Sequence, residues 1–363
     1  MSETRQDPSH RRPDDASAEA RTGRNGTGGA PVPGRASGIG SWPGGDVLDA
    51  LRTTFGELPE PHLPYLPELP VRGPGAGITG RTAALLVDLP VDLQPSGWRL
   101  VDHPGRDLAR ARALLRQDLD GLAEVADGYV GELKVQTAGP WTLAATLWLP
   151  RLERAVVDPG ACRDLVASLA EGVAAHVAEI RRLVGGARVV VQLDEPSLPG
   201  VLGGSLPTAS GFGRLRAVEE QVAVAGLRAV LDAATAAGAA DTVVHCCAAD
   251  VPVGALLRAG PGALAVDVTL LGTAGWEALA PAVEGGTGLF AGAVPAAGPV
   301  PSVTAVADAV LHPWRRLGLD PALLARVVTT PACGLAGATV PVARAALTRV
   351  RETAAVLAEH LRR

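Results

Sequence analysis

Short apolar runs alternate with longer amphipathic segments along most of the chain. The short runs are bounded by Gly, Pro and polar residues and predict β-strands. There are eight of them, at Ser37 to Ser41, Ala84 to Leu89, Tyr129 to Gln136, Arg188 to Leu193, Thr242 to Cys246, Leu264 to Val268, Gly288 to Ala293 and Arg326 to Thr330. The longer segments repeat apolar residues at every third or fourth position, which predicts helices. The clearest are Arg106 to Ala126, Cys162 to Val184, Ala217 to Ala237 and Pro341 to Leu361.

Alternating strands and helices are typical of a parallel sheet covered by helices. Eight such repeats in 363 residues predict an α/β fold of the closed (β/α)8 TIM-barrel type, with one domain over residues 36–363. A doubly wound open sheet is the alternative. The second strand, Ala84 to Leu89, is the weakest, because Pro90 follows it directly. The stretch Leu63 to Pro70 has no clear periodicity, and we interpret it as a long loop over the barrel mouth.

Residues 1–35 are polar and contain few apolar side chains. We expect a disordered tail there, because so little apolar surface cannot offset the entropy of ordering the chain. The tail has no apolar stretch of the signal-peptide kind. The uncharged segment Gly285 to Ala307 is interrupted by Pro295, Pro299 and Pro301, so no membrane-spanning segment is predicted.

The formal net charge is −5, which excludes a strongly basic surface, and we expect no nucleic-acid partner. Lys134 is the only lysine among 33 basic residues, which we attribute to a coding bias. Four cysteines are too few for a disulfide scaffold in a chain of this length. Reduced thiols suit a cytoplasmic metal enzyme.

His245 and Cys247 end the fifth predicted strand. Side chains alternate between the two faces of a strand, so these two point together and Cys246 points away. Cys333 follows the eighth predicted strand in a similar context. One imidazole and two thiolates from separate strand ends predict a catalytic zinc with one position open to substrate. Buried cysteines are also common as core residues, and we assign that role to Cys162 and Cys246.

Polar residues follow most of the predicted strands, where barrel enzymes place their active sites. They are Ser41, the stretch Gly139-Pro-Trp-Thr142, Asp194-Glu-Pro196, His245 and Cys247, Asp267 and Cys333. Asp194 and Glu195 are adjacent and should face opposite sides, so they are not an opposed glycosidase pair. Asp194 could bind an ammonium group or cap the following helix. Asp267 could be a fourth zinc ligand or cap its own loop.

A zinc held by two thiolates is electron-rich and polarises a carbonyl weakly. It lowers the pKa of a substrate thiol while the bound thiolate stays nucleophilic. The predicted chemistry is therefore alkyl or methyl transfer to sulfur, since hydrolytic zinc sites more often use histidine and carboxylate ligands.

Taken in order, these motifs resemble the catalytic barrel of cobalamin-independent methionine synthase, in the superfamily that also holds uroporphyrinogen decarboxylase. The resemblance covers most of residues 37–361. Its markers are Ile39-Gly-Ser41, Gly139-Pro-x-Thr142, Asp194-Glu-Pro196, His245-x-Cys247, Asp267 and Cys333-Gly-Leu335. It implies Zn²⁺ on His245, Cys247, Cys333 and Asp267, the last in place of a family glutamate. It also implies homocysteine contacts at Ile39, Ser41 and Asp194, with Asp194 holding the amino group.

The chain departs from the family pattern in three ways. Ala293 stands where the family has a histidine proton donor, and Thr146 stands where long members have a tryptophan that packs on the folate, with Trp148 nearby. The amino-terminal barrel of the long enzymes is absent. The family also has short, single-barrel relatives that take methyl from a corrinoid carrier instead. The resemblance therefore leaves open a methyl-folate donor, a methyl-corrinoid donor and a corrinoid protein partner.

The leading hypothesis is a zinc-dependent methyltransferase that converts homocysteine to methionine, with Asp194 in the catalytic site. A second hypothesis keeps the zinc-thiolate chemistry with another thiol or a corrinoid donor. A third is a barrel that binds an amino acid without turnover, motivated by Ala293 and the short Asp267. Decarboxylation of the tetrapyrrole type uses no metal and would leave the three soft ligands unexplained.

Overall fold

The computed structural model describes residues 32–151 and 153–361. The predicted tail lies outside the described residues up to position 31. Arg35, assigned to that tail, already belongs to the first strand, β1 (Arg35–Ala36). Within the described ranges, no helix combines the length and the hydropathy needed to span a bilayer.

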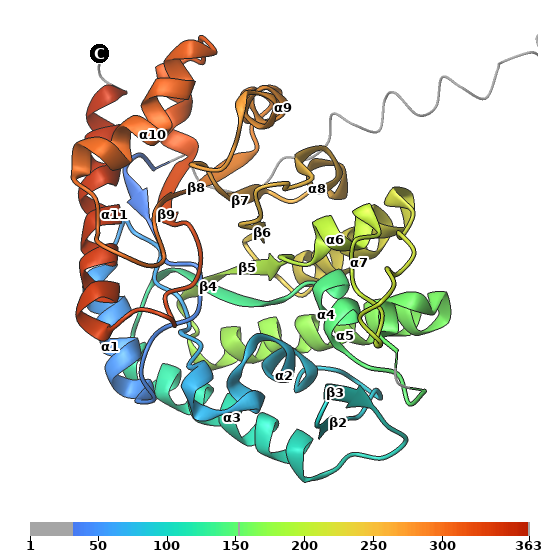
Figure 1. Ribbon diagram of the computed structural model, residues 1–363. Coiled ribbons are helices and arrows are strands. Elements are labelled where there is room, and N and C mark those ends of the chain that lie inside the picture. The colour runs from blue at the N-terminus through green and yellow to red at the C-terminus, as the bar shows by residue number, and fades with distance from the viewer. Residues whose placement is uncertain (1–31, 152, 362–363) are drawn as a thin grey trace, which may run out of the picture. The chain divides into compact units, whose positions relative to one another are not determined.

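Seven strands form one curved parallel sheet in the order β1-β9-β8-β7-β6-β5-β4, with helices along its outer side (Figure 1). Six of the predicted strands overlap strands of this sheet. They are β4 (Gly131–Ala138), β5 (Ala187–Asp194), β6 (Asp241–Cys246), β7 (Ala263–Asp267), β8 (Gly288–Val294) and β9 (Val327–Pro331). Because every neighbouring pair is parallel, the carboxyl ends of the strands share one edge.

The extended segment 63–68 bridges the two edge strands of this sheet and takes the eighth position of the barrel. On one side, the Leu63 N–H donates to the carbonyl of Ala36, next to β1, at 2.9 Å. On the other side, the Lys134 N–H of β4 donates to the Pro64 carbonyl at 2.9 Å, and the Leu66 N–H donates to the Lys134 carbonyl at 3.0 Å. Parallel bridges pair Tyr65 with Lys134 in the same way. The sheet is therefore closed by an irregular, proline-containing strand.

Two sequence predictions in this region are wrong. Ala84 to Leu89 is not a strand: helix α2 (Ile78–Ala83) ends there, and Ala84 and Leu85 form a turn. Leu63 to Pro70 is not a loop over the mouth, because its first six residues pair within the barrel. Proline removes backbone donors and interrupts the apolar alternation, so this strand has no periodic signature.

The sheet separates two apolar cores. The inner core contains Leu63, Val190, Val243, Ala263, Ala265, Phe290 and Val328. The outer core packs the other face of the strands against the helices, and it includes Val191, Val244 and Leu264. Alternation along each strand therefore sends one set of residues into the barrel and the next set to the helices.

The four predicted long helices are present with ends shifted by at most three residues, as α3 (Arg106–Val125), α5 (Pro159–Leu183), α7 (Glu220–Ala236) and α11 (Val340–His360). Helix α5 begins early because Asp158 accepts hydrogen bonds from the N–H groups of Gly160 and Ala161. The other helices are α1 (Val47–Glu57), α4 (Pro140–Thr146), α6 (Leu198–Gly203), α8 (Val253–Ala259), α9 (Thr273–Glu284) and α10 (Val303–Arg316). A two-stranded hairpin, β2 (Val91–Gln94) and β3 (Gly97–Leu100), is separate from the barrel sheet.

Gly38 lets the closing segment approach β1. A Cβ atom at this position would lie 2.3 Å from the ring of Tyr65, which is buried. We therefore expect Gly38→Ala to lower the free energy of unfolding by about 1–3 kcal/mol, measured by urea denaturation. Gly56→Ala in α1 is the matched control, because its Cβ meets nothing within 4 Å. That control should be neutral or slightly stabilising, and equal stability of the two variants would contradict the tight contact.

Candidate metal centre

Three soft ligands converge at the carboxyl edge of the sheet. His245 lies on β6, Cys247 follows it, and Cys333 follows β9. Their candidate ligand atoms all lie within 4.8 Å of one another, and the Sγ atoms of Cys247 and Cys333 are 3.1 Å apart. Strands β7 and β8 separate β6 from β9 in the sheet, so it is the curvature of the barrel that brings these side chains together. The residues could hold one metal ion.

The imidazole of His245 is held by one nitrogen and free at the other. Its Nδ1 lies 2.9 Å from Oδ1 of Asp194, at the carboxyl end of β5. Its Nε2 is buried without a hydrogen-bond partner. Burial lowers the pKa of His245, but the hydrogen bond to Asp194, the charge of Asp194 and the charge of Cys333 together outweigh burial and leave the pKa raised. An oriented imidazole with a free buried nitrogen fits a metal ligand with a carboxylate behind it.

The two thiols influence each other. The hydrogen bond from the thiol of Cys247 holds the pKa of Cys333 below its usual range, and the same bond raises the pKa of Cys247. Cys246 points away and belongs to the outer core, where burial raises its pKa to about 12. Cys162 is likewise in the outer core. The strand alternation predicted for Cys246 and Cys247 is therefore present in the structure.

Asp267 is not brought into this group. It ends β7, and its Oδ1 accepts hydrogen bonds from the N–H of Thr269 at 2.9 Å and from the hydroxyl of Thr269 at 2.6 Å. Within the described part of the chain, the ligand group has three members and omits Asp267. The short aspartate side chain instead caps its own loop, the alternative that the sequence left open.

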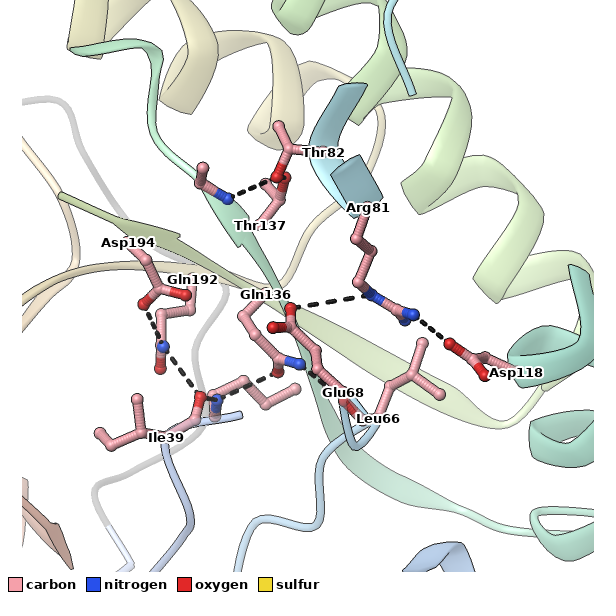
Figure 2. A network of polar contacts seen from close by, with 12 residues as sticks. Ile39, Leu66, Glu68, Arg81, Thr82, Asp118, Gln136, Thr137, Gln192 and Asp194 are labelled. Carbon is pink, nitrogen blue, oxygen red and sulfur yellow. Dashed lines mark hydrogen bonds and ion pairs between the residues drawn. The ribbon is translucent and has the colours of Figure 1, made fainter. Parts of the chain in front are cut away.

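The predicted substrate residues lie beside the three ligands. Asp194 accepts a hydrogen bond from Nε2 of Gln192 at 2.7 Å, and the same Nε2 donates to the Ile39 carbonyl at 2.9 Å (Figure 2). The Ser41 carbonyl accepts from the N–H of Leu335 at 2.8 Å. A Cβ at Gly334 would lie 2.1 Å from Oγ of Ser41, so the segment after Cys333 packs tightly against Ser41. Ile39, Ser41 and Asp194 are therefore gathered around the candidate metal ligands.

Asp194 and Glu195 have separate environments. The carboxylate of Glu195 is fully buried and accepts from the N–H groups of Trp141 and Thr142 at 2.9 and 2.7 Å, and from the Thr142 hydroxyl at 2.8 Å. It therefore fixes the start of α4. It also accounts for the glycine at position 139, because a Cβ there would lie 2.3 Å from Oε1 of Glu195. The motif Gly139-Pro-Trp-Thr142 has a structural role here.

Sequence reasoning missed Glu68, which lies at the end of the closing segment. It is 5% exposed, and its Oε1 has no hydrogen-bond partner. Nε of Arg81 lies 3.7 Å from that oxygen, and Arg81 also pairs with Asp118 (Figure 2). Burial raises the pKa of Glu68 to about 7, and the negative charge of Asp194 adds to this effect. Two buried carboxylates thus lie near enough to influence each other, an arrangement that a cationic ligand would stabilise.

The position of Lys134 near the site was also not predicted from the sequence. This residue extends from β4 into the barrel interior and is fully buried. Its Nζ donates to the Ile39 carbonyl at 2.6 Å. Burial lowers its pKa to about 7, while the charges of Asp194 and Glu68 oppose that change. The signal in the sequence was its uniqueness as a lysine. Nothing in the sequence indicated Glu68, because the segment that carries it was interpreted as a loop and not as a strand.

The departures from the family pattern also have defined positions. Ala293 packs in the outer core rather than facing the barrel interior. The hydroxyl of Thr146 donates to the Thr142 carbonyl at 2.8 Å at the end of α4. The ring of Trp148 is covered by the guanidinium of Arg154, 4.8 Å from the ring centroid. None of these three residues supplies an acid to the candidate site.

The fold and the site together define a helix-covered parallel α/β barrel with a group of soft ligands at its strand ends that could hold a metal ion. The family model described as the catalytic domain of cobalamin-independent synthase matches residues 35–356. The chain therefore belongs to that family, which is one of methyltransferases in methionine biosynthesis. The family name argues against a corrinoid protein as partner.

Two solved structures resemble this fold. The B12-independent methionine synthase from Shewanella sp. W3-18-1, solved with selenomethionine, has a TM-score of 0.58 and 12% identity, covering 92% of this chain and 99% of its own. A methyltransferase from Methanosarcina mazei has a TM-score of 0.52 and 16% identity, covering 86% of this chain and 83% of its own. A search of curated proteins gave no match. At these identities the likeness concerns the fold alone.

Proposed function

We propose that this chain transfers a methyl group to the sulfur of homocysteine to form methionine, with methyl-tetrahydrofolate as the donor and Zn²⁺ as the cofactor. One observation carries the proposal. His245, Cys247 and Cys333 place one imidazole and two thiols within 4.8 Å of one another. This ligand set suits an ion whose remaining position receives a substrate thiol.

The residues fit zinc in two further respects. Nε2 of His245 is buried without a partner, which is costly unless a ligand uses its lone pair. The hydrogen bond between Nδ1 and Asp194 directs that lone pair toward the thiols. When bound, zinc lowers the pKa of the homocysteine thiol and leaves a nucleophilic thiolate. Asp267 caps its own loop, so we assign the metal to three protein ligands.

Homocysteine carries an ammonium group, a carboxylate and a thiol. We assign the ammonium group to Asp194 and Glu68, the two buried carboxylates whose charges influence each other. Charge-assisted hydrogen bonds of this kind are about twice as strong as neutral ones. The Ile39 carbonyl accepts a hydrogen bond from the same Gln192 amide that donates to Asp194, so we assign the segment of Ile39 and Ser41 to the amino-acid backbone. Asp194 thus acts on the substrate and on His245 together.

In the transfer, the sulfur of homocysteine forms a bond to the methyl carbon while the bond from that carbon to the folate nitrogen breaks. The leaving nitrogen takes up a proton from solvent, which balances the proton that the homocysteine thiol gives up to solvent. Ala293 cannot supply it, because alanine has no acidic group and its side chain packs in the outer core. The contribution of the protein is therefore orientation of the two substrates and stabilisation of the thiolate.

Zinc quantification and X-ray absorption on the purified protein, with and without homocysteine, test the metal and the acceptor. We expect close to one zinc per chain and a sulfur-rich shell that gains a further sulfur when homocysteine is added. Turnover with methyl-tetrahydrofolate and with methylcobalamin, in parallel, tests the donor, and we expect methionine with the folate. A metal-free protein, or a zinc shell that homocysteine does not change, would overturn the proposal. Binding without turnover under both donors would favour an amino-acid-binding barrel.

A further inference from the structure

The single lysine of the chain occupies one of its most enclosed positions. Every other basic residue among the 33 is an arginine, and Lys134 is fully buried inside the barrel. Coding bias accounts for the arginines but not for the place of the one lysine. An ammonium group is compact and can lose its proton when buried, whereas a guanidinium is larger and remains charged. The location therefore indicates a requirement for an ammonium group at this point.

Lys134 contacts the segment that we assign to homocysteine. Its Nζ donates to the Ile39 carbonyl at 2.6 Å. Nε2 of Gln192 donates to the same carbonyl at 2.9 Å (Figure 2). Two donors from neighbouring strands thus hold one backbone oxygen. Oε1 of Gln136 lies 3.4 Å from the same Nζ, and a Cβ at Gly40 would lie 2.7 Å from Gln136. The backbone of 39–41 therefore rests directly on this layer of side chains.

The charge of Lys134 has no direct partner among the described residues, where it forms no ion pair. Its remaining neighbour is the ring of Tyr65, whose centroid is 5.2 Å from Nζ. Asp194 and Glu68 act on it through space, because both raise its pKa against the effect of burial. The amino group of Lys134 therefore lies buried beneath the backbone at 39–41, and Asp194 and Glu68 are close enough to raise its pKa.

We propose that Lys134 is a positioning residue for the amino-acid substrate. Its ammonium group holds the Ile39 carbonyl, and together with Gln192 it fixes the segment Ile39 to Ser41 against Asp194. The hydrogen bonds of Lys134 go to Ile39 and Gln136 and not to the three metal ligands, so it affects homocysteine binding through the backbone it holds. This inference rests on the proposed function, because it assigns Lys134 a task in the same site.

Steady-state kinetics of Lys134→Met test the proposal, because methionine has nearly the same length and no donor or charge. We expect the KM for homocysteine to rise at least about 10-fold, as lost hydrogen bonds to a charged group imply. The kcat should change less than the KM, while the KM for the methyl donor and the zinc content should stay at the wild-type level. Arg188→Met, on the neighbouring strand with a largely exposed side chain, is the control and should change none of these values.

A measurement on the wild-type protein does not depend on the variant folding. Because the chain has one lysine, protein labelled only with lysine carrying ¹⁵N at Nζ and ¹³C at Cε gives one side-chain NMR signal. We expect this signal to shift when homocysteine is added to the zinc-loaded protein. An unmoved signal at saturating homocysteine would contradict the inference even where Lys134→Met fails to fold.

The two proposals fail in different ways. If the wild-type protein neither binds nor methylates homocysteine, the proposed function is wrong. If the wild type turns over and Lys134→Met keeps the wild-type KM for homocysteine, only the positioning role is wrong. A loss of stability with unchanged kinetics would likewise assign Lys134 a purely structural role.

Discussion

Replacement of Cys247 by alanine should abolish stoichiometric zinc binding and reduce homocysteine methylation by at least about 10³-fold. Cys247 and Cys333 are 3.1 Å apart at their sulfurs, and together with His245 they make the only group of three such ligands among the described residues. Loss of one thiolate leaves two protein ligands, which is too few for a stable zinc site. The several kcal/mol that a metal contributes to a transition state convert to the stated factor at about 1.36 kcal/mol per tenfold. Metal analysis after dialysis and a methionine-formation assay measure both effects.

Cys246→Ala is the matched control for this prediction, since it removes the neighbouring sulfur. Its side chain belongs to the outer core and is fully buried, so the variant should lose about 1 kcal/mol of folding stability. Zinc content and activity should stay close to the wild-type values. If Cys246→Ala loses the metal and Cys247→Ala keeps it, the strand alternation at the site is reversed and the metal centre is misassigned.

Replacement of Asp194 by asparagine should lower kcat/KM for homocysteine by about 10³-fold while the protein stays folded. The carboxylate has two tasks: it receives the ammonium group in the proposed function, and it orients His245 through Nδ1 at 2.9 Å. Loss of a charged hydrogen bond costs about 1.5–3 kcal/mol, and loss of a partner behind a metal ligand costs about 10–100-fold in activity. Asparagine keeps an acceptor oxygen and nearly the same volume, so thermal stability should change little. Steady-state kinetics and a thermal melt measure the two outcomes.

Glu195→Gln provides the contrast to Asp194→Asn, because the two residues are adjacent. Glu195 accepts three hydrogen bonds from Trp141 and Thr142 at the start of α4. Glutamine replaces one of the accepting oxygens with an amide that donates, so this variant should lose stability while the KM for homocysteine changes little. The assignment of roles fails if Glu195→Gln raises the KM more than Asp194→Asn does.

Much of the metal site was predictable from local pattern alone. Alternation along a strand placed His245 and Cys247 on one face and Cys246 on the other, and the structure has this arrangement. The strand-helix repeat predicted a parallel α/β barrel, in which side chains at strand ends gather at one edge. Ser41 and Asp194 were predicted at strand ends in the same way, whereas Ile39 was proposed only from the family resemblance; all three lie beside the ligands. Their roles in binding homocysteine remain predictions.

Other features could not be predicted from strand alternation. The choice between ligand and loop cap at Asp267 depends on Thr269, whose backbone and hydroxyl compete for the same oxygen. The closing segment 63–68 was missed, because its prolines remove the alternation that marks a strand and its pairing partners lie far away in sequence. Glu68 was missed with it. The opposite error, a strand at Ala84 to Leu89, arose because an apolar run after a short helix resembles a strand in composition.

The sequence by itself determined which residues could bind metal and which face of each strand carried them, since side-chain chemistry and alternation are local properties. It also determined the fold class, because the order of strands and helices restricts the topology. Only the tertiary structure decided that segment 63–68 closes the barrel, that Asp267 binds its own loop, and that Lys134 and Glu68 lie buried near Asp194. The closing segment and the positions of Lys134 and Glu68 depend on distances between residues far apart in the chain, which are set by barrel closure rather than by any local pattern. The contact of Asp267 with Thr269 is local, but the sequence left its role open because a loop cap and a metal ligand use the same carboxylate oxygens.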